Sequence, residues 1–366
     1  MPINDIEKPP HVRQPRLRVL TNGKAIGGAY EFEISTNNYY QCDTFRAQFV
    51  TWADEKEFGP KWWGDQDEIL VDLQASLDGG ESWKSLLIGQ IDHLSMHIEK
   101  GVVLVDGRDL SARFIDNRTQ ETFINKTSSQ VVEELAARRG LTPDVTPTDT
   151  PVGRYYSADH DRISLGQFVR TTTEWNLMTS LAQHEDFDLY VTGTTLHFHP
   201  HTPPDEDPWL LIWDDESPWS NGINIQCDRS LTVAKDVVVA VRSWNSKQAQ
   251  EITKYAPSGA RQSSIQSGKT QLYSFIRPNL TQQQAQDLAN RLREEITRHE
   301  RLLTFKAPAD LDLTARKMVR LRGSRSSWDQ SYFVDNIRFR LSLDEGFTMD
   351  VRCKNRTPQS TVLTTG

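Results

Sequence analysis

Three histidines at alternate positions are the first residues in this chain whose spacing could do chemistry. If the segment is a strand, alternation places His197 and His199 on one face, with His201 just beyond them. Imidazole nitrogens grouped on one face are ligands for zinc and related metals. No Asp, Glu or Cys lies at ligand spacing beside them, and Pro200 is expected to disrupt the strand. The sequence therefore favours a surface strand over a metal site.

Two acidic runs follow the histidines and raise the question of acid–base catalysis. They contain Asp205, Glu206, Asp207, Asp214, Asp215 and Glu216. A glycosidase needs two carboxyl groups in a cleft with their pKa values held apart, whereas these runs are polar and flanked by proline, as solvated loops are. The chain also lacks a Gly-x-Ser-x-Gly elbow, a P-loop, a His-Glu-x-x-His motif and a Gly-rich dinucleotide motif. We therefore expect no catalytic, cofactor-binding or metal-binding residues and no enzymatic activity.

Composition narrows the class of protein. With 366 residues the chain is too long for one small core, and length suggests about two or three domains. Hydrophobic residues make up 37% and aromatic residues 9%, including 10 Trp, which indicates a folded, strand-rich protein. The formal net charge of -8 argues against nonspecific capture of DNA by a basic surface.

The cysteine pattern and the lack of long apolar segments indicate the cellular compartment in which the chain folds. Cys42, Cys227 and Cys353 are far apart and odd in number, so we expect free buried thiols instead of a disulfide framework or a zinc site. The N-terminus lacks the apolar core of a signal peptide, and no window approaches the ~20 apolar residues of a membrane span. We expect folding in the cytosol and no membrane partner.

The pattern of elements predicts a β-rich first half. Residues 1–15 contain several prolines and are expected to form a flexible arm. Short alternating strands then recur through 16–117, with hairpin or turn signals at Asn22-Gly23 and Asp78-Gly79-Gly80. Short strands at this regular spacing predict a small antiparallel barrel or sandwich, and we expect a first β-barrel domain at 16–117.

Helices and strands mix in the middle of the chain. Thr127 to Gln130 forms a capping-box pattern that opens a helix ending at Gly140, and Ser164 to Gln167 forms a second. A hairpin is expected around Gly193-Thr194. We therefore expect a compact α/β insert at 118–205.

Strands return from Trp209 onward. A third capping-box pattern at Thr281 to Gln284 opens a long helix, expected at 281–299, with an apolar stripe on one side. We expect a second β-barrel domain at 206–354 that includes this helix, followed by a loose C-terminal tail at 355–366.

One stretch carries a resemblance to a known family. In Gly101–Asn117 an apolar strand is broken at Asp106-Gly107, and Gly-Arg-Asp-Leu-Ser then leads into a short helical turn. This resembles the junction that ends the first barrel of contractile-phage baseplate hub proteins, the family of late control protein D and the T4 tail hub. Further family features follow in order: the helix at 128–139, the helix-and-hairpin unit from Glu174 to His199, and the closing hairpin Tyr332 to Val351 with its Gly-x-Thr turn.

The resemblance implies both a fold and an assembly. The fold class would be α+β, mainly β, with two small antiparallel β-barrels of tail-tube type, an α/β insert between them and a long helix in the second barrel domain. Three copies would form a pseudo-sixfold ring in the virion baseplate, assembled in the host cytoplasm. The ring would adapt a sixfold tail tube, or distal tube protein, to a threefold spike; wedge and tape-measure proteins are further candidate partners. DNA would pass through the channel without specific binding, and the spike would be a separate polypeptide.

Two surface features suggest that the chain assembles with other chains, but they do not identify the contacts. Trp52, Trp62 and Trp63 lie in or beside a polar loop, where they are either interface anchors or part of a loop folded over its own barrel. The acidic run 205–216 and the basic stretch 291–325 could meet across a subunit boundary. Two other functions stay open: a tail-associated peptidoglycan hydrolase, for which the hub assignment leaves no spare segment, and a carbohydrate-binding β protein, suggested by the ten Trp.

Overall fold

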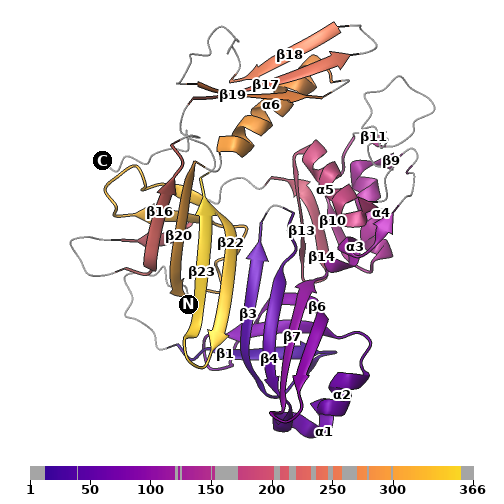
Figure 1. Ribbon diagram of the computed structural model, residues 1–366, viewed down its shortest axis with the longest axis vertical. Helices are drawn as coiled ribbons and strands as arrows, with labels where there is room; N and C mark the ends of the chain where they lie inside the picture. The colour runs from indigo at the N-terminus through magenta and orange to yellow at the C-terminus, as the bar shows by residue number, and fades with distance from the viewer. Residues whose placement is uncertain are drawn as a thin grey trace.

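The protein is mainly β, with one large sheet and several small ones (Figure 1). The computed structural model describes residues 13–38, 40–119, 123, 126–149, 151–152, 172–201, 207–213, 220–231, 236–245, 250–257, 270–277, 280–297 and 300–355. The expected second capping box at Ser164 and most of the two acidic runs lie outside these residues, as do most of the N-terminal arm and the C-terminal tail.

Thirteen strands form the large sheet, and they come from both ends of the chain. The N-terminal strands are β1 (Arg16–Thr21), β2 (Lys24–Ala25), β3 (Ala29–Asn37), β4 (Thr44–Val50), β5 (Leu70–Ser76), β6 (Lys84–His97) and β7 (Val102–Asp109). The C-terminal strands are β15 (Trp209–Ile212), β16 (Ile223–Arg229), β20 (Arg301–Pro308), β21 (Met318–Arg322), β22 (Ser331–Ser342) and β23 (Gly346–Lys354). We call these groups the first and the second sheet unit. Their order is β16-β20-β23-β22-β3-β4-β7-β6-β5-β1-β2, with β21 beside β22 and β15 beside β21.

The two sheet units are joined by one antiparallel strand pair, β3 with β22. Phe32 lies opposite Leu341 and Ile34 opposite Phe339, and all four side chains are buried. Among the described residues the strands of both units form one continuous large sheet and no closed barrel is found, so the two small β-barrels expected from the sequence stay a prediction. The alternating pattern identified the strands, but an edge strand can pair with any other free edge, and β3 pairs with the far end of the chain.

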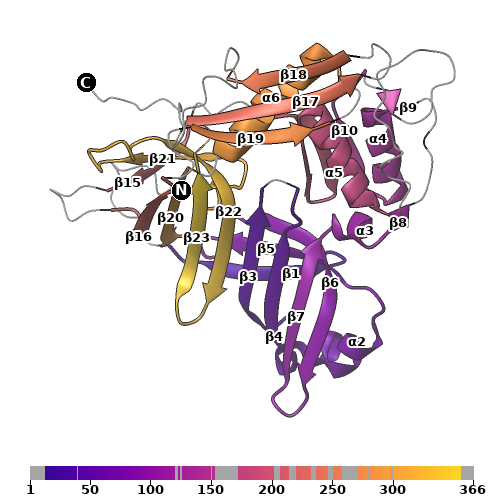
Figure 2. The same ribbon diagram turned by 45° about the horizontal axis from the view of Figure 1, so that its top comes forward.

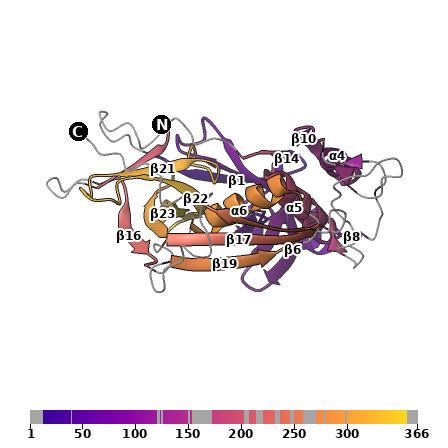
Figure 3. The ribbon, with the colours of Figure 1, turned by 90° about the horizontal axis from the view of Figure 1, so that it is seen from above.

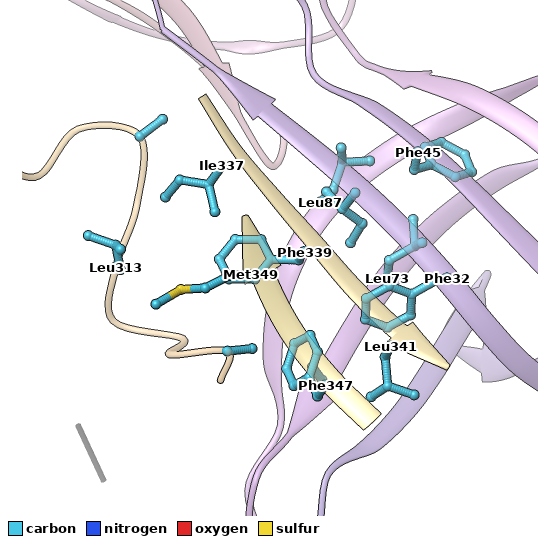
Figure 4. Close-up of a cluster of buried hydrophobic side chains, with 14 of the residues drawn as sticks. Phe32, Phe45, Leu73, Leu87, Leu313, Ile337, Phe339, Leu341, Phe347 and Met349 are labelled. Carbon is cyan, nitrogen blue, oxygen red and sulfur yellow. The ribbon is translucent and has the colours of Figure 1, made fainter. Parts of the chain in front are cut away.

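A single hydrophobic core runs through both sheet units. It contains residues from β3, β4 and β5 together with residues from β20, β22 and β23. Where the units meet, Phe32 packs edge-on against Phe347 with ring centroids 6.0 Å apart, and Phe339 and Met349 lie beside them (Figure 4). Apolar burial is the largest stabilising contribution to a fold, so this shared core makes the units mutually dependent.

The motif at Asp106-Gly107 does not break its strand, contrary to expectation. Strand β7 continues to Asp109, and the irregularity lies in the neighbouring strand, where β6 bulges between Ile91 and His93. A Cβ on Gly107 would lie 2.2 Å from the Gln90 carbonyl oxygen and 2.4 Å from the Phe45 ring. Glycine is therefore needed there for the close approach of the neighbouring strand.

Local turn signals in the first sheet unit are confirmed. Asn22 and Gly23 both have positive φ, 49° and 78°, as a type I′ hairpin turn requires. The end of the expected arm is not free: Gln14 donates a backbone hydrogen bond to Leu77 and accepts one from Gly79. The chain is therefore anchored to the sheet from about the start of the described residues.

The insert has its own core and is mixed α/β, as expected. Its elements are α3 (Ala112–Ile115), β8 (Arg118–Thr119), β9 (Lys126–Thr127), α4 (Ser128–Arg138), β10 (Thr142–Val145), β11 (Pro151–Val152), β12 (Thr172–Thr173), α5 (Glu174–Glu185), β13 (Phe187–Thr192) and β14 (Thr195–Pro200). Its three-stranded sheet has the order β10-β14-β13, with β10 parallel to β14. Leu196 and Phe198 point toward α4 and α5 and are fully buried.

Helix starts follow from capping chemistry. The capping box at Thr127 and Gln130 is confirmed, with the Thr127 side chain accepting from the Gln130 amide and the Gln130 side chain accepting from Thr127. The box at Thr281 and Gln284 is confirmed in the same way, with distances of 3.2 and 2.9 Å. Helix α5 begins at Glu174, directly after β12, and the side chain of its N-cap, Thr173, accepts a hydrogen bond from the Asn176 backbone amide.

A third group of elements stands apart from the large sheet. Strands β17 (Asp236–Asn245), β18 (Gln250–Ala256) and β19 (Thr270–Ile276) form a separate sheet in the order β18-β17-β19, and α6 (Gln282–Thr297) packs on one side of it (Figures 2 and 3). We call this the helix-backed sheet. The expected second barrel domain at 206–354 thus divides between two sheets, while its long helix agrees with the expected 281–299 within two residues. The domain boundaries themselves stay a prediction.

Two further expectations concern thiols and membranes. Cys42, Cys227 and Cys353 are free; Cys353 is fully buried and the others are half-buried. None of the helices in the described part of the chain is long and apolar enough to cross a bilayer.

Replacing Phe32 with Ala tests whether the two sheet units are mutually dependent. Phe32 is fully buried at the junction of β3 and β22, so we expect the free energy of unfolding to fall by about 3–5 kcal/mol. Chemical denaturation followed by tryptophan fluorescence and by circular dichroism should show one transition shifted as a whole. The control is Leu343→Ala, because Leu343 is 84% exposed; equal stability of the two variants would contradict the shared core.

Candidate functional site: a junction of the sheets and an Asp–His cluster

The loop between β3 and β4 joins the first sheet unit to the second. The Asn38 side-chain amide donates to the carbonyl oxygens of Ala315 and Val334, at 3.0 Å each. The Arg316 guanidinium donates to the Asn38 side-chain oxygen. A short polar loop therefore fixes the position of the segment between β20 and β21.

The same loop also holds the insert. The Tyr40 hydroxyl donates to the Phe187 carbonyl oxygen at 2.7 Å, and the Trp175 indole donates to the Tyr40 carbonyl oxygen at 2.8 Å. Tyr40 has a positive φ of 66°, an uncommon conformation for a non-glycine residue that orients both its groups toward the insert. The β3–β4 loop is thus a three-way junction between the sheet units and the insert.

The Gly-Arg-Asp-Leu-Ser motif supplies the other side of this junction. Arg108 binds Asp92 through two hydrogen bonds of 2.5 and 2.9 Å, and it binds Asp116 through two more. These contacts connect β6, β7 and the end of α3. Leu110 within the motif and Phe114 just after it enter the core of the insert, so the motif carries the chain from one core to the next.

The carboxyl groups of Asp43 and Asp109 lie close together next to this junction. The Asp43 backbone amide donates to the Asp109 carboxylate at 3.2 Å, and the Asp109 backbone amide donates to the Asp43 carbonyl oxygen at 2.9 Å. Burial, followed by the charge of Asp109, raises the pKa of Asp43 to about 8. Burial also raises the pKa of Asp109 to about 6, against the lowering effect of its hydrogen bonds from Ser111. Buried carboxyls close together disfavour double ionisation.

In the fold, an acidic residue that the sequence pattern did not reveal lies beside the histidines. Asp144 on β10 lies opposite His197 on β14 in the parallel register. The Asp144 carboxylate Oδ2 is 2.8 Å from His197 Nδ1 and 3.8 Å from His199 Nε2. We call Asp144, His197 and His199 the Asp–His cluster; their ligand atoms all lie within 4.8 Å of one another. Pro200 does not disrupt the strand, since it is the last residue of β14 and pairs with Phe187.

His201 is separate from the Asp–His cluster. Its Nδ1 lies 2.7 Å from Asp188 Oδ1, and its Nε2 lies 3.5 Å from Asp186 Oδ1. Hydrogen bonds that the imidazole donates to the carboxylates of Asp186 and Asp188 raise the pKa of His201 to about 9, so the side chain is cationic at neutral pH. The three histidines of the sequence pattern therefore divide into a pair and a single ion-paired residue.

The loop that carries Trp52, Trp62 and Trp63 folds back over its own sheet at two of these residues, and a role as interface anchors stays a prediction. Trp63 is 3% exposed and packs on Phe49, and Trp62 packs on Phe58, so this part folds back over its own sheet. Trp62 and Trp63 lie in α2 (Pro60–Asp65), Phe58 is the last residue of α1 (Glu55–Phe58), and Phe49 lies in β4. Trp52, in the 3-10 turn Thr51–Asp54, is 71% exposed.

Comparison with known proteins gives a fold and no family assignment. No family model matches the chain, and no curated protein matches it. Among solved structures, a tail protein from Neisseria meningitidis is 15% identical with a TM-score of 0.67, covering 94% of this chain and 99% of that one. A 43 kDa prophage MuSo2 tail protein from Shewanella oneidensis is 14% identical with a TM-score of 0.68 and the same coverage.

A third similar structure comes from a secretion system. It is an Escherichia coli type VI secretion component, described as similar to the T4 tail proteins gp27 and gp5, with 11% identity and a TM-score of 0.55. This match covers 94% of the present chain and 78% of the other. The chain thus has the fold of phage tail proteins over nearly its whole length.

The carboxyl pair predicts a pH dependence of stability. Both pKa values are raised above the ordinary value of 3.8, so the folded state holds protons that the unfolded state releases. Stability is therefore lost as pH rises from about 4 to about 8. Replacing Asp43 with Asn keeps the hydrogen-bond acceptor for Asn37 and removes the charge.

We expect the melting temperature of Asp43→Asn, relative to the unmodified protein, to rise steadily between pH 5 and pH 8. Asp344→Asn, in an exposed turn, is the control and should show no such trend. A difference for Asp43→Asn that is the same at every pH would contradict the raised pKa.

Proposed function

We propose that this protein is a structural baseplate or tail hub protein of a phage or phage-like contractile particle. Three copies form a pseudo-sixfold ring that adapts a sixfold tail tube to a threefold spike and surrounds the DNA channel. The observation that carries this proposal is the similarity in fold to two phage tail proteins across 94% of the chain and 99% of theirs.

The architecture supports an assembly of this kind. Each chain contributes a first and a second sheet unit held side by side by the β3–β22 pair, so three copies present six units around an axis. The ring does not require fully closed barrels, because neighbouring copies can cover the open sheet edges. The net charge of -8 also limits adhesion to DNA in a channel.

The outer edge of β16 is a candidate contact between copies. Strand β16 ends the large sheet, and its other side pairs with no strand among the described residues. Exposed apolar side chains lie on or beside it: Trp213, Ile223 and Leu231 are 47%, 60% and 70% exposed. An apolar sheet edge of this kind favours pairing with another chain.

The partners follow from the same proposal. The ring contacts a tail tube or distal tube protein on one side and a spike protein on the other, and it works in the virion baseplate after assembly in the host cytoplasm. Structures of a VgrG protein complexed with PdpA also share this fold, at 10% identity and a TM-score of 0.54.

The mass of the assembled protein tests the ring. We expect native mass spectrometry to give three times the chain mass of 41.9 kDa, for the protein alone or mixed with the products of its neighbouring genes. Ile223→Lys should shift the distribution toward single chains, because a cation at the β16 edge disfavours contact between copies.

The matched control for this test is Ile98→Lys, at an exposed turn after β6, where Ile98 is 78% exposed. We expect it to leave the trimer intact. Single chains under every condition, including mixtures with the neighbouring proteins, would refute the proposed ring.

The absence of enzymatic activity is a separate prediction. Purified protein added to cell walls should leave their turbidity unchanged over hours, because no element of the proposal calls for hydrolysis. Lysis that disappears when a single carboxylate such as Asp207 is replaced would instead support the peptidoglycan hydrolase.

A further inference from the structure

The outer face of the insert sheet is polar, in contrast to its helix-covered face. Leu196 and Phe198 point to the helices and are buried, so the alternating residues His197 and His199 point to the other side. Asp144 joins them from the neighbouring strand β10. Backbone pairing between the parallel strands β10 and β14 sets Asp144 beside His197. Their relative position is therefore fixed by the sheet and not by a flexible loop.

We infer that the Asp–His cluster binds a divalent transition-metal ion of the zinc class. Two imidazole nitrogens and one carboxylate oxygen are a common zinc ligand set, with metal–ligand distances of about 2.0–2.2 Å. Ligand atoms around a tetrahedral ion are then about 3.3–3.5 Å apart. The observed separations from Asp144 Oδ2 are 2.8 and 3.8 Å, on either side of that spacing, and all three ligand atoms lie within 4.8 Å of one another.

Neighbouring groups hold the ligands in place. The Tyr190 ring stacks on His197 with centroids 4.6 Å apart and an angle of 19° between the planes, and His199 lies 5.5 Å from His197 at 27°. The Arg316 side chain lies over Tyr190, 3.7 Å from its centroid. Rings that are already packed lose less freedom when they bind an ion.

The cluster is also open to the ion. The side chains of His197, His199 and Asp144 are 18%, 28% and 56% exposed, which leaves an entry path and room for a water molecule as the fourth ligand. His201 is not part of the set, because its two nitrogens face Asp186 and Asp188. The bound ion would link β10 to β14 and so fasten two segments 53 residues apart.

This inference is independent of the hub proposal, since it rests on the insert alone. It differs from the sequence-based expectation of no metal site because that expectation depended on the lack of a carboxylate at ligand spacing. The carboxylate is supplied from β10, across the sheet.

Cobalt and zinc titration of the full chain, without a histidine tag, tests the site. We expect one Co²⁺ per chain with the visible absorption of a low-coordinate site, displaced by Zn²⁺, and a melting temperature that rises with Zn²⁺ and falls back on chelation. His197→Ala and His199→Ala should each weaken binding by at least about tenfold. Asp144→Asn should weaken it as well while keeping a hydrogen-bond partner for His197.

The matched control is His93→Ala, an exposed histidine on β6 outside the cluster. It should bind Co²⁺ like the unmodified protein, and circular dichroism should show that every variant is folded. The inference is overturned if the unmodified protein binds no Co²⁺ at about millimolar concentration. It is equally overturned if the His197→Ala, His199→Ala double variant binds as well as the unmodified protein, which would mean adventitious binding only.

Discussion

The antiparallel pairing of β3 with β22 is the constraint on which the rest of the structure depends. It joins strands from opposite ends of the chain and merges two sheet units into one sheet with one core. The segments between β7 and β15 and between β16 and β20 leave this sheet and return to it. The insert and the helix-backed sheet are the described parts of the two excursions, each with its own smaller core.

The β3–β4 loop makes this arrangement rigid where the parts meet. Asn38 binds the second sheet unit, and Tyr40 binds the insert. Arg316 continues the connection, since it contacts Asn38 and lies over Tyr190 of the insert. In the proposed hub role, a fixed relation between the parts of the chain matters more than a reactive pocket.

Local features were predictable from the sequence, whereas pairings between distant segments were not. The Asn22-Gly23 turn, the capping boxes at Thr127 and Thr281 and the α/β character of the insert follow from short-range chemistry. The joining of the two strand groups into one sheet was not predicted, because alternation specifies a strand and its buried face, not its partner. Gly107 was singled out correctly, but its role is to admit a neighbouring strand and a bulge, not to end β7.

The Asp–His cluster shows the same limit. Spacing alone found His197 and His199, while Asp144 enters only through a parallel pairing. A lone Asp in the segment after Gly140 gives no signal that could have indicated it.

Imaging of the assembled particle by electron cryomicroscopy tests the central claim most directly, because it shows how many chains and how many sheet units surround the axis. The account predicts three chains around the channel at the base of the tail tube, each placing its two β3–β22-linked sheet units side by side to give six. A ring of six chains with one unit each facing the channel, or a single chain away from the axis, would contradict it.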